Sequence, residues 1–494
     1  MTVTCSQMQQ LEEAAFARGV SAADLMEEAG RGIAAVVRQF FPKPGLLVLY
    51  LGRGNNAGDA LVAARELRKS GWKLVARTVS DPAAMKPLPL DHWRSLGDSV
   101  RPCDFVPEHP GPVVALDGLL GIGARGPLEG VMRSLAAEMN ELRRTRHAAT
   151  VAMDIPSGLD GDTGEACADA VMADVTATVA QVKQGLVADA ALDHVGRLAV
   201  VPLAELKWEG EATGPEVMTP AFLRPLLPRR SFGMHKGQAG RVAIIAGSRG
   251  FLGAGVLSGL GALRGGAGLI TLFTKPDAYD LLAMKMPPEV MVRSVPSYWD
   301  AVEGHDVIAI GPGIGFAHEQ EVLAMIRDVR QRMVVDADAL SILARQGIPV
   351  ARGPRLLTPH PGEMARLTVR QPDWRTLGRA ALAEAFARAH SGTTLLLKGS
   401  RTVVATAGKP VRFNTTGHPG MATGGIGDVL TGLLSALLAQ GMELHDAASM
   451  GSWLVGRAAE ICISTGMRSP EALSAGDVAD FIGNAFDELR EECW

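Results

Sequence analysis

The stretch LYLGRGNNAGDALVAAR, residues 49–65, joins an apolar run to a segment with helical spacing through a polar, glycine-containing turn. A glycine-rich turn between a strand and a helix is typical of a phosphate-binding loop in a parallel α/β fold. This turn contains no lysine, and it places Asn55, Asn56 and Asp59 at a helix N-terminus. The stretch therefore predicts an α/β fold with a polar ligand site at the end of this strand.

The same turn also fits a dinucleotide-binding fingerprint. GRGNNA at residues 52–57 matches G-x-G-x-x-A, and Asp81 lies where an acid could hold a ribose. One such fingerprint is weak evidence, because a tight turn also needs glycine for its backbone conformation. It leaves open an NAD-dependent oxidoreductase, although no partner for hydride transfer is evident.

Strand-like runs that alternate with helical segments continue along the whole chain. A polar segment rich in Gly and Pro, residues 207–220, interrupts the alternation. We therefore predict two α/β domains, residues 1–212 and 213–494, with helices dominating from Gly427 onward. The predicted strand regions are 46–51, 73–79, 113–121 and 149–158 in the first domain, and 241–247, 269–274, 307–313, 332–340, 355–363, 394–400 and 401–408 in the second.

Composition and charge restrict the classes of binding partner and the cellular compartment. A net charge of -4 and a pI near 6.3 argue against nucleic acid or an anionic membrane as the main partner. Five scattered cysteines without C-x-x-C spacing indicate neither a disulfide framework nor a zinc site. With no secretion-signal pattern at the start, we expect a cytoplasmic enzyme. Its small, glycine-rich helices permit self-association, and we expect a homo-oligomer.

Two further strand ends in the first domain carry oxygen-bearing side chains. Asp117 lies in the later part of the strand region 113–121, and Asp154 and Ser157 lie in the later part of the region 149–158. Ligands of open α/β sheets bind at the carboxyl ends of the strands, so these turns should meet the asparagine turn in one crevice. Amide, carboxylate and hydroxyl oxygens suit a hard cation.

These motifs together resemble the YjeF-type N-terminal NAD(P)H-hydrate epimerases. The resemblance rests on GRGNNAGD, DGLLGIGARGPLEG, MDIPSGLDGDTG and ADVTATVAQVKQGL, which occur in that order within residues 5–205. It implies a Rossmann-like three-layer domain and a potassium ion held through Asn56, Asp117 and Ser157. The implied contacts to the hydrated dinucleotide are Asn55, Asn56, Ala57, Gly58, Asp59, Gly121, Ile122, Gly123, Ala124, Arg125, Gly126, Pro127 and Asp154.

The chain departs from the family pattern at two places in this domain. Ala57 replaces a glycine of the usual NNGGD turn, and alanine fits there if its φ is negative. The usual MENAG reads Met26-Glu27-Glu28-Ala29-Gly30. We take Asp154 as the catalytic group that accepts or returns a proton during epimerisation.

A second glycine-rich turn, GMATGGIGDVL at residues 420–430, opens a helix in the second domain. Backbone N–H groups at such a helix start form an anion site, and Asp428 lies on the first turn beside it. TPHPGE at residues 358–363 puts His360 at a strand end that should face the same side of the sheet as this turn. KGSRT at residues 398–402 joins two strand regions and could hold nucleotide phosphates.

With HKGQAG, GPGIG and DADAL, these motifs resemble the ribokinase-like fold, and within it the ADP-dependent NAD(P)H-hydrate dehydratases. His418 stands where that family commonly has asparagine. In kinases of this fold the aspartate after the glycines is the base, which makes Asp428 catalytic, and magnesium would accompany ADP. The resemblance implies hydrate contacts at Ala254, Gly313, His360 and Asp428, and ADP contacts at Lys398, Gly399, Ser400, Arg401, Thr402 and Gly427.

The function predicted is therefore repair of NAD(P)H hydrate: epimerisation of the R and S forms, then ADP-dependent dehydration of the S form to give AMP and phosphate. One alternative is a ribokinase-like kinase of a vitamin precursor with a dinucleotide-binding N-terminal module. It would leave a phosphorylated product that persists. Another is a module that binds the hydrate without interconverting its epimers.

Overall fold

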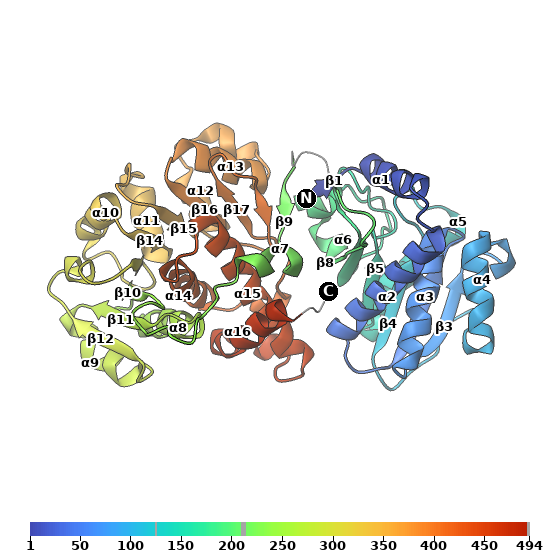
Figure 1. The fold of residues 1–494 in the computed structure, drawn as a ribbon, viewed down its shortest axis with the longest axis horizontal. Helices are drawn as coiled ribbons and strands as arrows, with labels where there is room; N and C mark the ends of the chain where they lie inside the picture. The colour runs from blue at the N-terminus through green and yellow to red at the C-terminus, as the bar shows by residue number, and fades with distance from the viewer. Residues whose placement is uncertain (124–125, 209–213, 492–494) are drawn as a thin grey trace. The chain divides into compact units, whose positions relative to one another are not determined.

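The structure is a computed structural model, and it describes residues 1–123, 126–208 and 214–491. The chain divides into two compact units (Figure 1), which meet in sequence between Gly214 and Pro215. The boundary predicted between residues 212 and 213 lies outside the described residues. Each unit is described by itself.

The first unit, blue to green in Figure 1, is built on a six-stranded parallel sheet. The strand order is β3-β2-β4-β5-β6-β8, so the order reverses between β2 and β4 and leaves a crevice at their carboxyl ends. Its elements are β1 (Thr2–Val3), α1 (Cys5–Ala17), α2 (Ala22–Phe40), β2 (Leu46–Leu51), α3 (Asn55–Lys69), β3 (Lys73–Thr78), α4 (Pro87–Leu96), β4 (Val113–Gly118), α5 (Gly130–Arg146), β5 (Ala149–Met153), β6 (Val175–Val179), β7 (Val182–Lys183), α6 (Leu192–Val195) and β8 (Arg197–Val201).

Strand β2 shows why this unit has three layers. All six of its residues are buried. Leu47, Leu49 and Leu51 pack into the core formed with α2 and α3, whereas the alternate residues of β2 pack into the core formed with α5. Because successive side chains of a strand point to opposite faces, an unbroken apolar run needs helices on both faces. The predicted three-layer α/β architecture is confirmed.

The second unit carries a ten-stranded sheet in the order β12-β11-β10-β13-β14-β15-β16-β17-β18-β9. Strands β12 to β16 of this order run parallel, and β17 is antiparallel to both of its neighbours. Its elements are β9 (Glu216–Val217), α7 (Pro220–Leu223), β10 (Arg241–Ile245), α8 (Leu252–Arg264), β11 (Leu269–Thr274), α9 (Pro276–Lys285), β12 (Val290–Ser294), β13 (Val307–Ile310), α10 (Glu319–Asp328), β14 (Arg332–Val335), α11 (Ala337–Gln346), β15 (Arg355–Leu357), α12 (Pro361–Leu367), α13 (Arg379–Ala389), β16 (Thr393–Leu397), β17 (Val403–Thr406), β18 (Arg412–Phe413), α14 (Ile426–Ala439), α15 (Leu444–Ser464) and α16 (Ala475–Arg490).

Helices dominate the end of this unit, as predicted, and they cover one face of its sheet. Helix α14 is buried along most of its length and shares one core with α15, α16 and side chains of β13 to β17. Among the described residues, no helix combines the length and the hydropathy needed to span a bilayer. The apolar character of α14 therefore reflects burial in the protein core.

Several predicted strand regions were too long. Residues 332–340 and 355–363 contain only the short strands β14 and β15, and helices α11 and α12 begin directly after them. Asp336 and His360 are the N-cap residues of these helices, and at His360 the ring nitrogen Nδ1 accepts from backbone N–H groups of the first turn. These side chains therefore stand where a strand changes into a helix.

Candidate active sites

The turn after β2 is determined by a close approach between two chain segments at Gly52. A Cβ added to Gly52 would lie 2.0 Å from the carbonyl oxygen of Leu119, so only glycine fits. Helix α3 then begins at Asn55 with Gly54 as its N-cap. Ala57 lies within this helix, buried and without a positive φ, so its methyl group introduces no backbone strain.

The three residues predicted to hold potassium belong to one hydrogen-bond network. Ser157 Oγ donates to Asp117 Oδ1 at 2.7 Å, and Ser157 N–H donates to Asp117 Oδ2 at 2.8 Å. Ser157 Oγ also accepts from the N–H of Leu120 at 3.1 Å. The Leu120 carbonyl in turn accepts from Asn56 Nδ2 at 2.6 Å. The turns that follow β2, β4 and β5 thus meet at one place.

This network has the chemistry of a site for a hard cation. Burial raises the pKa of Asp117 to about 6, although hydrogen bonds from Ser157 and Leu119 lower it. A bound cation would favour the ionised carboxylate at the same position. The amide, carboxylate and hydroxyl oxygens of Asn56, Asp117 and Ser157 are ligands that an alkali cation accepts, so the residues present fit potassium.

Asp154 is held in a strained conformation at the end of β5. Its φ is +66°, in the left-handed region that non-glycine residues rarely adopt. Its Oδ1 accepts from Thr178 Oγ1 at 3.2 Å, from Val179 N–H at 3.1 Å and from Lys183 Nζ. Strain of this kind persists where the surroundings fix the residue firmly, which is common at functional sites.

Lys183 was missed as a site residue by sequence reasoning, although it lies in the motif ADVTATVAQVKQGL. Its side chain is 1% exposed and forms an ion pair with Asp154, whose side chain is 13% exposed. Its only signal in the sequence is a lysine in an otherwise apolar strand segment.

Asp59 and Glu12 add two carboxyl groups to this cluster. Burial, together with the charges of Asp154 and Glu12, raises the pKa of Asp59 well above its usual range. Burial, followed by the charge of Asp154, also raises the pKa of Glu12, and Lys183 opposes the shift. This environment favours the protonated form of Asp59 more than water would.

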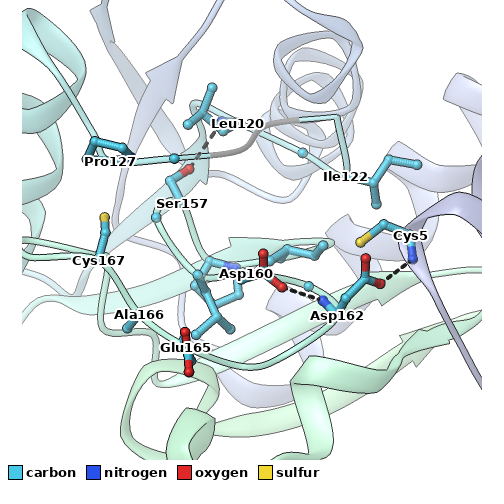
Figure 2. Close-up of a pocket in the computed structure, with 17 residues that line it drawn as sticks. Cys5, Leu120, Ile122, Pro127, Ser157, Asp160, Asp162, Glu165, Ala166 and Cys167 are labelled. Carbon is cyan, nitrogen blue, oxygen red and sulfur yellow. Dashed lines mark hydrogen bonds between the residues drawn. The ribbon is translucent and has the colours of Figure 1, made fainter.

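A cavity of about 310 Å³ lies beside the potassium network (Figure 2). Figure 2 shows Ser157 and Leu120 at one side, and Asp160 and Asp162 toward Cys5. Of the predicted dinucleotide contacts, Gly121, Ile122, Gly126 and Pro127 line the cavity, whereas the asparagine turn and Asp154 do not. The predicted contacts Ala124 and Arg125 lie outside the described residues.

In the second unit, four neighbouring parallel strands, β13 to β16, end at one edge of the sheet. The residues after them are Gly311, Asp336, Thr358 and Lys398. Helix α14 begins at the same edge, because a Cβ added to Gly427 would lie 3.2 Å from Lys398 Nζ and 3.6 Å from Asp336 Oδ2. Its N-cap Gly425 has φ +94°, which favours glycine.

Lys398 turns toward carboxylates at this edge. Its Nζ donates to Asp336 Oδ1 at 2.8 Å, and Asp336 Oδ2 accepts from Thr431 Oγ1 at 2.8 Å. Burial, with the charges of Asp336 and Asp338, raises the pKa of Asp428 to about 7, although Lys398 lowers it. A carboxyl group that titrates near neutral pH can act as a general base.

The other predicted dehydratase contacts differ in their neighbours and in their exposure. A Cβ added to Gly313 would meet Ala254 Cβ at 3.0 Å, so these two residues are neighbours. His360 contacts Glu363, and burial raises the pKa of Glu363. Gly399 and Ser400 are exposed, whereas Arg401 and Thr402 are buried, which disfavours direct side-chain contacts of this last pair with ADP.

The two other departures from the family patterns have structural explanations. His418 Nδ1 accepts from Gly420 N–H at 3.0 Å and caps the turn before the glycines, a role that asparagine also fills. Glu28 Oε1 accepts from the N–H of Ala204 at 3.1 Å, so it fastens the segment after β8 to α2.

Comparisons with known proteins match one family model to each of the two units. The family model for NAD(P)H-hydrate dehydratase matches residues 242–477, and the model for the YjeF-related protein N-terminus matches residues 22–185. A bifunctional NAD(P)H-hydrate repair enzyme of Moorella thermoacetica is 33% identical over 99% of this chain and 97% of its own length. One from Gloeobacter violaceus is 37% identical over 92% of this chain and 94% of its own.

Solved structures are similar to the second unit. An ADP/ATP-dependent NAD(P)H-hydrate dehydratase from Bacillus subtilis, co-crystallised with ATP and Mg²⁺, is 30% identical, with a TM-score of 0.49. The match covers 56% of this chain and all of that chain.

Proposed function

The chain belongs to the family of bifunctional NAD(P)H-hydrate repair enzymes, and on this basis we propose which of the two activities each unit carries. It is an NAD(P)H-hydrate epimerase and dehydratase. Residues 1–212 carry the epimerase, and residues 213–494 carry the dehydratase. The observation that carries the proposal is that each matching family model falls within one unit, and each unit has its own cluster of buried carboxyl groups.

The epimerase site lies at the carboxyl ends of β2, β4 and β5. Asp154 accepts a proton from the hydrate and returns it, while the hydroxylated carbon passes through an intermediate without that configuration. The asparagine turn, with Asn55 to Asp59, and the segment 121–127 bind the hydrated dinucleotide. Potassium, held by Asn56, Asp117 and Ser157, would supply a fixed positive charge beside the substrate.

In the dehydratase site, Asp428 takes the proton of the hydrate hydroxyl as the oxygen attacks the terminal phosphorus of ADP. AMP leaves, and the hydroxyl has become a phosphate ester. Loss of phosphate from this ester, together with a ring proton, regenerates the reduced nicotinamide. The N-terminus of α14 receives the transferred phosphoryl group, and the Lys398 ammonium lies beside it.

The remaining dehydratase contacts are proposed around this centre. The hydrate contacts Ala254, Gly313 and His360. ADP contacts Lys398, Gly399, Ser400 and Gly427, and it contacts Arg401 and Thr402 through their backbone, because their side chains are buried. Magnesium would enter with ADP, and the carboxylates of Asp428 and Glu363 are oxygen donors near Lys398 that suit it.

We also propose that the enzyme works as a homo-oligomer in the cytoplasm. The scattered cysteines, none in C-x-x-C spacing, support a reducing setting.

The test is recovery of reduced nicotinamide absorbance from a mixture of NADH hydrate epimers with ADP, magnesium and potassium. Complete recovery with one AMP and one phosphate per NADH supports both activities. Recovery that stops at the share of one epimer would contradict the epimerase. A phosphorylated product that persists would favour the kinase alternative instead.

A further inference from the structure

The ammonium group of Lys183 has all of its hydrogen-bond capacity used inside the protein. It donates to Asp154 Oδ1, to the carbonyl of Val179 at 2.9 Å and to Thr178 Oγ1 at 3.3 Å. A lysine ammonium has three donors, and each therefore has an acceptor. Because its side chain is buried, Lys183 has no donor left for a substrate, and it acts through Asp154.

The same contacts fix which oxygen of Asp154 is available. Oδ1 accepts from Lys183, Thr178 and Val179, whereas Oδ2 has no hydrogen-bond partner among the described residues. The backbone is fixed as well, because the N–H of Asp154 donates to the carbonyl of Ala177 at 2.8 Å. The carboxylate is therefore held by one oxygen and has the other one free to accept a proton.

Lys183 is the one cation in the cluster of titratable groups described around Asp154. The titratable groups that interact with it electrostatically are Asp59 on α3, Glu12 and Cys5 on α1, and Lys183 on β7, and of these only Lys183 is cationic. Like charges nearby and burial both favour the neutral form of a carboxyl group. Asp59 has no cationic partner among the described residues, and burial together with the charges of Asp154 and Glu12 raises its pKa, which makes it a weaker candidate for the ionised acceptor.

We propose that Lys183 is a positioning residue of the epimerase, which selects Asp154 from the facing carboxyl groups as the ionised proton acceptor and orients its Oδ2. The inference rests on the proposed epimerase role of the first unit and adds the residue that makes Asp154 competent.

The test uses the full chain and follows interconversion of the two NADH hydrate epimers by chromatography without ADP, so that the dehydratase is idle. Lys183→Met removes the charge and keeps most of the stem. We expect kcat to fall about a hundredfold at pH 7, with KM changed much less. The acidic limb of the pH profile should move to higher pH, and Lys183→Arg should return it toward the wild-type position. Lys69→Met removes an exposed lysine of the same unit, paired with Glu66, and should leave rate and profile unchanged.

An unshifted acidic limb in Lys183→Met would overturn the inference, as would a Thr178→Val variant that reproduces both the loss and the shift. If Lys183→Met does not fold, the test compares Asp154→Asn with the double variant that carries both Asp154→Asn and Lys183→Met. The double variant leaves no unpaired charge, because both partners of the ion pair are then neutral. The double variant should be no slower than Asp154→Asn, since residues that act as one unit are not additive. A further loss in the double variant contradicts the inference. Lack of epimerisation in the wild-type chain would instead refute the proposed function.

Discussion

Asp428 offers the sharpest test of the dehydratase site, because its carboxyl group titrates close to working pH. With a pKa of about 7, roughly a tenth of the enzyme carries the base form at pH 6 and roughly nine tenths at pH 8. If the carboxylate is the base, kcat/KM for dehydration rises about tenfold over this interval. The Asp428→Asn variant keeps the shape and loses the base, and we expect a loss of about a thousandfold at pH 8.

The assay follows NADH absorbance from the purified S hydrate at saturating ADP and magnesium, and epimer interconversion is measured separately without ADP. Asp336→Asn tests whether neighbouring charges set the pKa of Asp428. It removes a negative charge that raises the pKa of Asp428 and frees the positive charge of Lys398, so the midpoint should move to lower pH. Asp480→Asn, which breaks an exposed ion pair with Arg264, should keep the wild-type midpoint.

Titration of the substrate phosphates acts on every variant alike, so the difference between midpoints reports the enzyme. Equal loss of epimerisation and dehydration in Asp428→Asn would refute the assignment to two separate sites. A midpoint that moves upward in Asp336→Asn would refute the electrostatic account of the base.

Three further predictions concern the first unit. Gly52→Ala should destabilise the unit by about 1–3 kcal/mol in urea unfolding, because the new methyl meets the Leu119 carbonyl; Gly54→Ala, with open space around it, should cost much less, and equal losses would contradict the clash. The potassium concentration for half-maximal epimerisation should be higher at pH 5.5 than at pH 7.5, because below about pH 6 a proton competes with the cation for Asp117, and a pH-independent value would separate Asp117 from the cation. Ala57→Gly should keep the epimerisation rate and lower stability by about 1 kcal/mol in thermal unfolding, since Ala57 lies inside α3; a faster enzyme would show that the methyl group hinders the substrate.

The arrangement of strands was predictable because periodicity is a local property. The apolar run of β2 has the same bounds in the sequence and in the structure, residues 46–51, since no polar residue interrupts it. The start of α12 was not predictable from periodicity, because His360 and Glu363 cap that helix through contacts between side chain and backbone. Weak, short strands such as β12 were missed for a related reason, as its exposed residues leave little apolar pattern.

The individual site groups could be proposed from motifs, but their pairing could not. Asp154 and Lys183 are 29 residues apart, and the ion pair forms only because the segment after β6 returns the lysine to the end of β5. Burial of Arg401 and Thr402 depends likewise on the hairpin between β16 and β17, which a motif match does not describe. Long-range geometry decides which residues of a motif face the ligand.

The left-handed backbone at Asp154 limits how this position can change in evolution. Among the common residues, glycine, asparagine and aspartate adopt such a φ most readily, and only aspartate of the three carries a charge. The substitutions that the fold accepts most easily are therefore those that remove the carboxylate. A lineage that loses this residue should retain a folded first unit without the proposed proton acceptor, so an intact fold is no guarantee of the activity in distant relatives.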